Sequence, residues 1–177
     1  MSKVLRTETL DEHEFKFTLS SYPKDSFWSK EFIIFQWFIH LEGSKEIKEK
    51  LIIDIISSEL KFVRVIKERI NSLESRKTVH YLEESSINYH SMINYPFVCK
   101  RRSVKSDYQL DKFMFSNNQC DRLIECEGDI ESFRIFCEEN SIVLNEDVSF
   151  DSRYKNHNMA IPFEKKHLLI LEALKKV

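Results

Sequence analysis

Glycine and proline are scarce in this 177-residue chain, which contains two glycines and three prolines. Folds that hold phosphate on bare backbone usually need glycines in the phosphate-binding loop. The sequence has neither a GxGxxG nor a GxxxxGK[ST] pattern. These absences argue against a P-loop or dinucleotide site. They argue less strongly against enzymes in general, because strained catalytic turns also favour glycine.

Metal-binding spacings and export signals are also missing from the sequence. The four cysteines form no CxxC pair and no spacing typical of zinc. The first residues show no basic segment followed by an apolar run, so we expect a cytoplasmic protein with free thiols. We expect no metal and no cofactor. The abundance of Ile, Lys, Phe and Asn is typical of AT-rich genes, which are common in phages and mobile elements.

Strong charge of either sign is absent, because the net charge is -2. A balance this close to zero predicts neither a strong nucleic-acid binder nor an acidic tail protein. The length suits one domain covering residues 1–177. A soft boundary near residue 78 is the alternative, with a helical half at 1–77 and a mixed half at 78–177.

The longest apolar run is Phe32–Leu41, interrupted only by Gln36 and His40. As a helix it would be ~15 Å long, whereas a membrane span needs about 20 apolar residues. Ser29 could cap a helix here, and Gly43 suits the left-handed position that follows a helix. The pattern therefore predicts a buried central helix, with a buried strand as the main rival.

A second, longer helix is expected from Ser44 to about Glu74, because apolar residues recur there at helical spacing. The short link at Gly43 would make the two helices a hairpin. The segment after Ser58 is compatible with a strand as well, which would break the second helix there.

The remaining elements are mostly short. Phe15, Phe17 and Leu19 alternate with polar residues and predict an N-terminal strand. The expected later elements are a strand at Arg122–Cys126, a helix from Asp129 with Cys137 on its inner face, a strand from Ser141, and a C-terminal helix from Pro162. Residues 78–119 have no clear assignment. We predict an α+β fold with a mixed or antiparallel sheet containing a strand–helix–strand unit.

Four histidines could carry chemistry. His80, His90 and His157 lie in polar surroundings and are candidates for general acid–base work in a metal-independent nuclease or nucleotide-processing enzyme. Their spacing matches no metal or nucleophile motif, so the alternative is ordinary surface histidines, and no catalytic residue is assigned. His40 is expected to be a core histidine.

A short basic run offers another candidate site. Its members are Lys100, Arg101, Arg102 and Lys105. Beside aromatic residues they could contact phosphate, as in a nucleic-acid-binding accessory protein. A solvated ion-pair surface is the simpler interpretation.

The strongest charge asymmetry is acidic. Between Cys120 and Asp147 the chain has nine acidic residues and two arginines, a local charge of -7 that leaves +5 elsewhere. The candidate partner-binding residues are Glu125, Glu127, Asp129, Glu131, Glu138 and Glu139. An acidic face suits a protein partner with a basic surface, such as a nuclease toxin or a host defence protein. The leading hypothesis is therefore a small inhibitor of the immunity-protein, toxin–antitoxin or phage-inhibitor type.

Overall fold

The computed structural model describes residues 3–22, 27–71, 73–83, 89–117, 120 and 122–175. Its strands are β1 (Val4–Ser21), β2 (Lys30–Glu42), β3 (Lys45–Asp54), β4 (Leu60–Arg69), β5 (Glu74–Leu82), β6 (Phe97–Lys105), β7 (Tyr108–Phe115), β8 (Arg122–Glu127) and β9 (Val143–Asp147). Its helices are α1 (Tyr89–Met92), α2 (Ile130–Glu139), the short 3-10 turn Ser152–Tyr154, and α3 (Lys165–Leu174).

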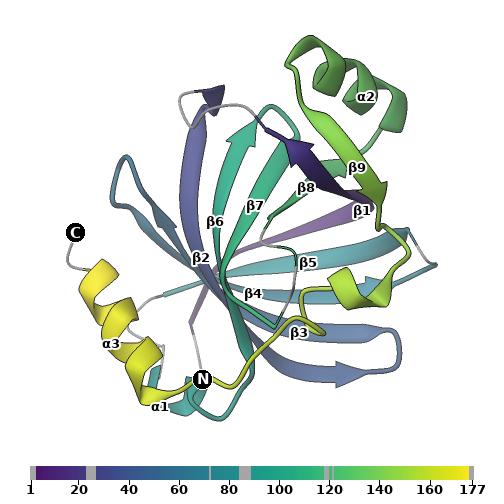
Figure 1. Ribbon diagram of the computed structural model, residues 1–177. Coiled ribbons are helices and arrows are strands. Elements are labelled where there is room, and N and C mark those ends of the chain that lie inside the picture. The colour runs from purple at the N-terminus through teal and green to yellow at the C-terminus, as the bar shows by residue number, and fades with distance from the viewer. Residues whose placement is uncertain are drawn as a thin grey trace.

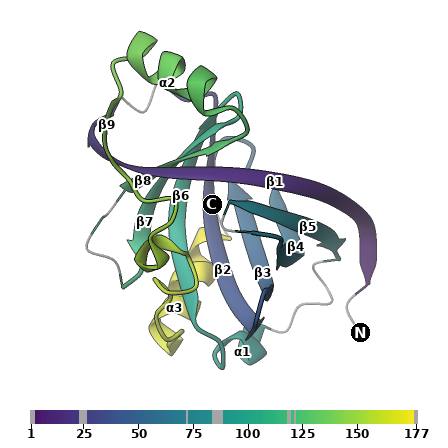
Figure 2. The ribbon, with the colours of Figure 1, turned by 90° about the vertical axis from the view of Figure 1, so that its right-hand side faces the viewer.

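In the described part of the chain, β1 to β8 close into an eight-stranded antiparallel barrel (Figure 1). The strand order is β5-β4-β3-β2-β6-β7-β8-β1, and β1 pairs with β5 to close the circle. Strand β1 is long enough to contribute twice, because its first half pairs with β5 and its second half with β8. Figure 2 shows β1 running across the whole barrel, with β9 added beside its far end.

The fold corrects the α+β prediction, and the helical hairpin is wrong. Residues expected to form the first helix are strand β2, and those expected to form the second helix are strands β3 and β4. Gly43 has φ +55°, which suits a tight hairpin turn as well as a helix end, so the local signal was ambiguous. Ser58, also at positive φ, lies in the turn between β3 and β4, where the alternative interpretation placed a break.

Three other expectations are confirmed. The strand–helix–strand unit is present as β8, α2 and β9. Helix α2 begins after Asp129, whose carboxylate accepts a hydrogen bond from the Ser132 amide. The C-terminal helix α3 begins at Lys165 and the N-terminal strand is present, although β1 is much longer than predicted. Residue 78 lies inside β5, and of the unassigned residues 78–119, many belong to β5, β6 and β7.

The apolar core lies on the outside of the barrel wall. Alternate residues of β2, Phe35 and Trp37, are fully buried there, and they pack with Phe97 of β6 under Phe163 and Leu171. A second outer cluster places Phe133 and Cys137 of α2 against the other side of the barrel. Helices α3 and α2 thus cover opposite sides of one barrel (Figure 1).

Among the described residues, no helix is long and apolar enough to cross a membrane.

Candidate functional site

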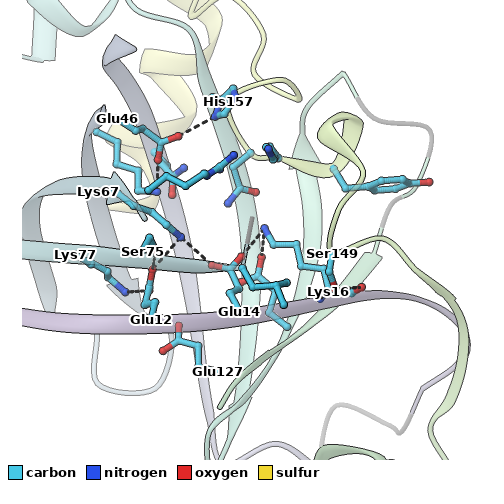
Figure 3. A pocket seen from close by; sticks show the side chains of 18 of the residues that line it. Glu12, Glu14, Lys16, Glu46, Lys67, Ser75, Lys77, Glu127, Ser149 and His157 are labelled. Carbon is cyan, nitrogen blue, oxygen red and sulfur yellow. Dashed lines mark hydrogen bonds and ion pairs between the residues drawn. The ribbon is translucent and has the colours of Figure 1, made fainter. Parts of the chain in front are cut away.

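The inside of the barrel is charged. Side chains from seven of the strands and from the segment that follows β9 line one cavity (Figure 3). Its charged members are Glu12, Glu14 and Lys16 of β1; Glu46, Lys48 and Lys50 of β3; Lys67 and Arg69 of β4; Glu74 and Lys77 of β5; Lys100 and Arg102 of β6; Glu125 and Glu127 of β8; and Asp151 and Lys155 beyond β9. These are nine basic and seven acidic residues, an excess of positive charge.

The cavity has a volume of about 100 Å³. On the same measure one water needs only about 10–15 Å³. The interior is therefore large enough for a small, highly polar molecule, and two apolar clusters bound it. One is built on Phe38, Val98 and Leu123, and the other on Val63, Val65 and Val79.

Strand β1 supplies an alternating row of charge, Glu12-His13-Glu14-Phe15-Lys16. Period-two alternation turns Glu12, Glu14 and Lys16 to the interior. Lys16 Nζ lies 2.7 Å from Glu14, and Lys67 lies 2.9 Å from Glu12 and 3.1 Å from Glu14. Burial alone would raise the pKa of Glu12, but Lys67 and Lys77 outweigh it, so that the pKa is lowered.

A second network joins β6, β7 and β8. Asp111 is completely buried and pairs with both Lys100 and Arg102, the latter at 2.6 Å. Arg102 also contacts Glu125 at 2.6 Å. Removing Asp111 would leave Lys100 without its carboxylate partner, which is costly in a low-dielectric interior.

The segment after β9 closes against β3 through a histidine. His157 Nδ1 lies 2.8 Å from Glu46 Oε2, and Lys48 Nζ lies 2.5 Å from the other oxygen of the same carboxylate. Burial would raise the pKa of Glu46, but Lys48 and His157 lower it overall. This contact holds His157 at the rim of the cavity.

Lys50 is one of the cavity cations that have no carboxylate partner among the described residues. Within the described part of the chain, no carboxylate pairs with its amine, and the charges that act on it most strongly are Lys48, Lys77, Arg102 and Lys100. Burial and these four cations together hold its pKa well below that of an ordinary lysine. Directly across the β2–β3 pairing lies Gln36. Its Nε2 is buried without a hydrogen-bond partner among the described residues.

Like Lys50, Glu127 has a pKa that is shifted in favour of the neutral form. Its carboxylate accepts a hydrogen bond of 3.3 Å from the Gln109 amide. Burial raises its pKa, Lys77 lowers it, and repulsion from Glu12, Glu14 and Glu125 raises it further, so that the net shift is upward. A half-buried carboxylate with a raised pKa is a candidate proton acceptor.

Among the described residues, no three His, Cys, Asp or Glu side chains lie close enough to hold a metal ion by themselves. Magnesium does not need such a cage, because it commonly binds one or two carboxylates together with substrate phosphates. Glu12, Glu14 and Glu127 are oxygen donors of the type that it prefers, although Glu12 and Glu14 are paired with lysines in this structure.

The predicted acidic face divides into two parts. Glu125 is buried and Glu127 is half-buried, and both face the barrel cavity. Asp129 caps α2. Glu131, Glu138 and Glu139 are exposed on α2 itself.

The predicted basic run also divides, because neighbouring strand residues point to opposite faces. Lys100 and Arg102 line the cavity. Arg101 contacts Glu31 at 2.7 Å, and the Lys105 ammonium lies 3.6 Å from the centre of the Phe27 ring.

The histidines are dispersed. His157 is the one of the three candidates that lines the cavity. His80 lies 2.9 Å from the Thr7 hydroxyl, and His90 is exposed on α1. His40 is half exposed and contacts Glu42 at 3.2 Å, so the expectation of a core histidine is wrong.

Most cavity residues were missed because they stand in segments interpreted as helices or ordinary strands. The signal was present as charge at alternate positions on β1 and on Glu46, Lys48 and Lys50 of β3. In a half-buried strand alternate polar residues normally face solvent. Only barrel closure reverses that assignment and gathers them inside.

The fold and the site define a closed antiparallel barrel with a charged interior, in which the basic residues that line the cavity slightly outnumber the acidic ones. No protein-family model matches the chain, and no curated protein matches it. The chain is similar to a solved structure described as "Structure of PH1819 protein from Pyrococcus Horikoshii OT3". The TM-score is 0.46 at 11% identity, covering 91% of this chain and 99% of that one.

Proposed function

We propose that the barrel binds a linear oligophosphate and, with a divalent cation, hydrolyses one of its phosphoanhydride bonds. Inorganic tripolyphosphate and the phosphate chain of a nucleoside triphosphate are the ligands of this class. The observation that carries the proposal is the excess of cations that line the cavity, above all Lys50, which has no anionic partner among the described residues.

An anion is the group that this interior lacks. Four cations act on the Lys50 amine, and beside it the buried Gln36 amide has a donor without a partner among the described residues. Buried donors are normally satisfied, and buried like charges repel strongly. A phosphate oxygen would accept from both donors and relieve the repulsion.

A linear ligand with several charges fits better than a single phosphate, because cations extend over the strands from Lys48 of β3 to Arg102 of β6. The carboxylates of β1 and β8 would share a divalent cation with the phosphates. That cation would supply charge neutralisation on the phosphate oxygens. Glu127 would take a proton from the attacking water.

The direct test is titration calorimetry with sodium tripolyphosphate, followed by an assay of phosphate release with and without Mg²⁺. We expect binding that weakens as salt is added, and phosphate release that depends on Mg²⁺. Absence of tripolyphosphate binding would contradict the proposal. Binding without release in any divalent cation would reduce it to a binding protein.

A pair of lysine variants makes the test specific. Lys50→Met removes the unpaired cavity cation, whereas Lys112→Met removes an exposed lysine from the outer face of β7. We expect the first to weaken tripolyphosphate binding at least about tenfold, equivalent to ~1.4 kcal/mol. The second should bind like the wild type.

A second proposal rests on a different surface. Glu131, Glu138 and Glu139 stand exposed on α2, away from the cavity. These three residues still suit the predicted binding of a protein partner with a basic surface, now limited to electrostatic attraction to α2. A pull-down from the native host with wild-type and charge-reversed α2 tests it, and a captured partner that ignores the reversal would contradict it.

A further inference from the structure

Lys50 differs from its neighbours in the barrel in one respect that matters for covalent chemistry. Lys16, Lys48, Lys67, Lys77 and Lys100 each contact a carboxylate. The Lys50 amine contacts none among the described residues, and it lines the same cavity. A lysine without a counter-ion, held among cations, resembles the lysines that enzymes use as nucleophiles.

The charged groups around Lys50 come from every side of the barrel. They are Glu12, Glu14 and Lys16 from β1, Glu46 and Lys48 from β3, Lys67 from β4, Lys77 from β5, Lys100 and Arg102 from β6, and Glu125 and Glu127 from β8. The carboxylates are largely taken up by the other cations, and the net effect on Lys50 is a pKa well below its usual range. A lowered pKa means that more of the amine is neutral, and therefore nucleophilic, near neutral pH.

We infer that Lys50 is a self-acylation site that takes the acyl group of a small acyl phosphate. The phosphate of the reagent would lie among Lys48, Lys77, Lys100 and Arg102, which places its acyl carbon near the unpaired amine. The inference rests on the phosphate binding proposed above, but it requires no hydrolysis of an oligophosphate.

The reaction balances without a further co-reactant. The lone pair of Lys50 Nζ attacks the acyl carbon, and a carbon–nitrogen bond forms. The bond between the acyl carbon and the bridging oxygen breaks, and its electron pair leaves with inorganic phosphate. The amine proton passes to that phosphate. The products are an amide on Lys50 and free phosphate.

An acyl phosphate suits this site by size and by chemistry. It has a dianionic end for the cations and a compact electrophile, and a small one such as acetyl phosphate is of a scale that a cavity of about 100 Å³ can accept. The amide would occupy the space beside Gln36 and remove the charge of a lysine that has no carboxylate partner among the described residues. Acylation would therefore shut the cavity to oligophosphates.

The experiment exposes purified protein to acetyl phosphate near neutral pH and maps acetylated lysines by mass spectrometry over time. Each unit by which the pKa lies below an ordinary lysine gives about tenfold more free amine. We expect Lys50 to react at least about tenfold faster than the exposed Lys112. Tripolyphosphate should slow the reaction at Lys50 and leave Lys112 unaffected.

The pH profile provides a second measurement on unmodified wild-type protein. As pH rises, exposed lysine amines become neutral and react faster, whereas the neutral fraction of Lys50 increases less because its pKa is already lowered. The advantage of Lys50 should therefore shrink as pH rises. A Lys50 rate at or below that of Lys112 throughout, or one that tripolyphosphate does not slow, would overturn the inference.

Lys50→Arg keeps a cation in the cavity and removes the nucleophile. We expect the fast acetylation to disappear from the time course of this variant, while Lys112 is acetylated at the wild-type rate. If wild-type protein binds tripolyphosphate but Lys50 is not acetylated, this inference alone fails. If tripolyphosphate does not bind at all, the proposed function fails first.

Discussion

The two faces of the barrel wall differ sharply although they alternate residue by residue along the same strands. On β2, Phe35 and Trp37 face outward into a cluster of aromatic residues, whereas Gln36 between them faces the cavity. On β3, Leu51 is outside and Lys50 inside. A small barrel is usually filled by apolar side chains; in this one the two larger apolar clusters lie outside the wall, under the helices.

The outer face therefore contributes stability, and the inner face is available for binding a ligand. Burial of aromatic side chains on the outer face stabilises the fold. Desolvation of the charges on the inner face costs free energy. Replacing buried ion pairs by apolar residues is often neutral or stabilising. A charged interior therefore makes physical sense as a site for a charged ligand.

The largest effect is expected where the outer face is truncated. Trp37 has no exposed surface and packs against Phe35 and Phe163. Trp37→Ala should lower the free energy of unfolding by about 3–5 kcal/mol. Thermal and denaturant unfolding measure this. An unchanged midpoint would show that the outer cluster does not hold the barrel together.

The next effect breaks a pair on the inner face. Asp111→Ala would leave Lys100 and Arg102 buried without their shared carboxylate. We expect a loss of about 3 kcal/mol, within the range for breaking a buried ion pair. Added tripolyphosphate should raise the unfolding midpoint of the variant part of the way to the wild-type value, because it would bind the cations that have lost this carboxylate. A variant as stable as wild type without ligand would show that the interior is well hydrated.

Acid should destabilise the inner face before the outer one. The folded pKa of Glu12 and that of Glu46 lie below the unfolded value of 4.5. Their contribution is fully present above about pH 4.5 and is lost as pH falls through the lower folded values. Unfolding free energy followed from neutral to acid pH should fall in that window. A flat profile would contradict the assigned ion pairs.

A smaller effect of opposite sign is expected for Glu127, whose pKa is raised in the fold. Its ionised form is disfavoured there, so its contribution is unfavourable above the folded pKa and is relieved as pH falls. Glu127→Gln should therefore raise the melting temperature at neutral pH and leave it nearly unchanged in acid. If the gain appears equally at both pH values, charge is not its cause.

The smallest effect should follow charge reversal on the exposed face of α2. Glu131→Lys with Glu138→Lys changes side chains that are solvated, so each should cost within about 0.5 kcal/mol. Tripolyphosphate binding should be unaffected, since neither residue lines the cavity. A large loss of stability or of tripolyphosphate binding would show that α2 takes part in the site. It would contradict the assignment of ligand binding to the inner face of the barrel wall.

Local signals were reliable only where partners are near in sequence. The strand–helix–strand unit was predictable because Asp129 caps α2 and β8 and β9 flank it closely. The run Phe32–Leu41 was misassigned because a strand apolar on one face and containing Gln36 on the other imitates a helix with a narrow polar stripe. Its true partners, β3 and β6, could not be read from its own residues.

The candidate site was predictable only in fragments. Lys100, Arg102, Glu125, Glu127 and His157 were singled out, but in three separate hypotheses. Nothing in the sequence links Lys100 to Asp111 or Glu46 to His157, contacts that join different elements. Lys100 and Arg102 of the basic run and Glu125 of the acidic face belong to one network of ion pairs around Asp111 and Arg102.

By itself the sequence determined the scarcity of glycine that argues against phosphate loops, the absence of metal spacings, and the alternation of charge along β1 and β3. It did not determine which face of each strand would be inside, because a period of two has no preferred direction. Pairing of β1 with β5 decided that, by closing the sheet and turning alternate charges inward. The paired and unpaired cations of the cavity therefore exist only in the tertiary structure.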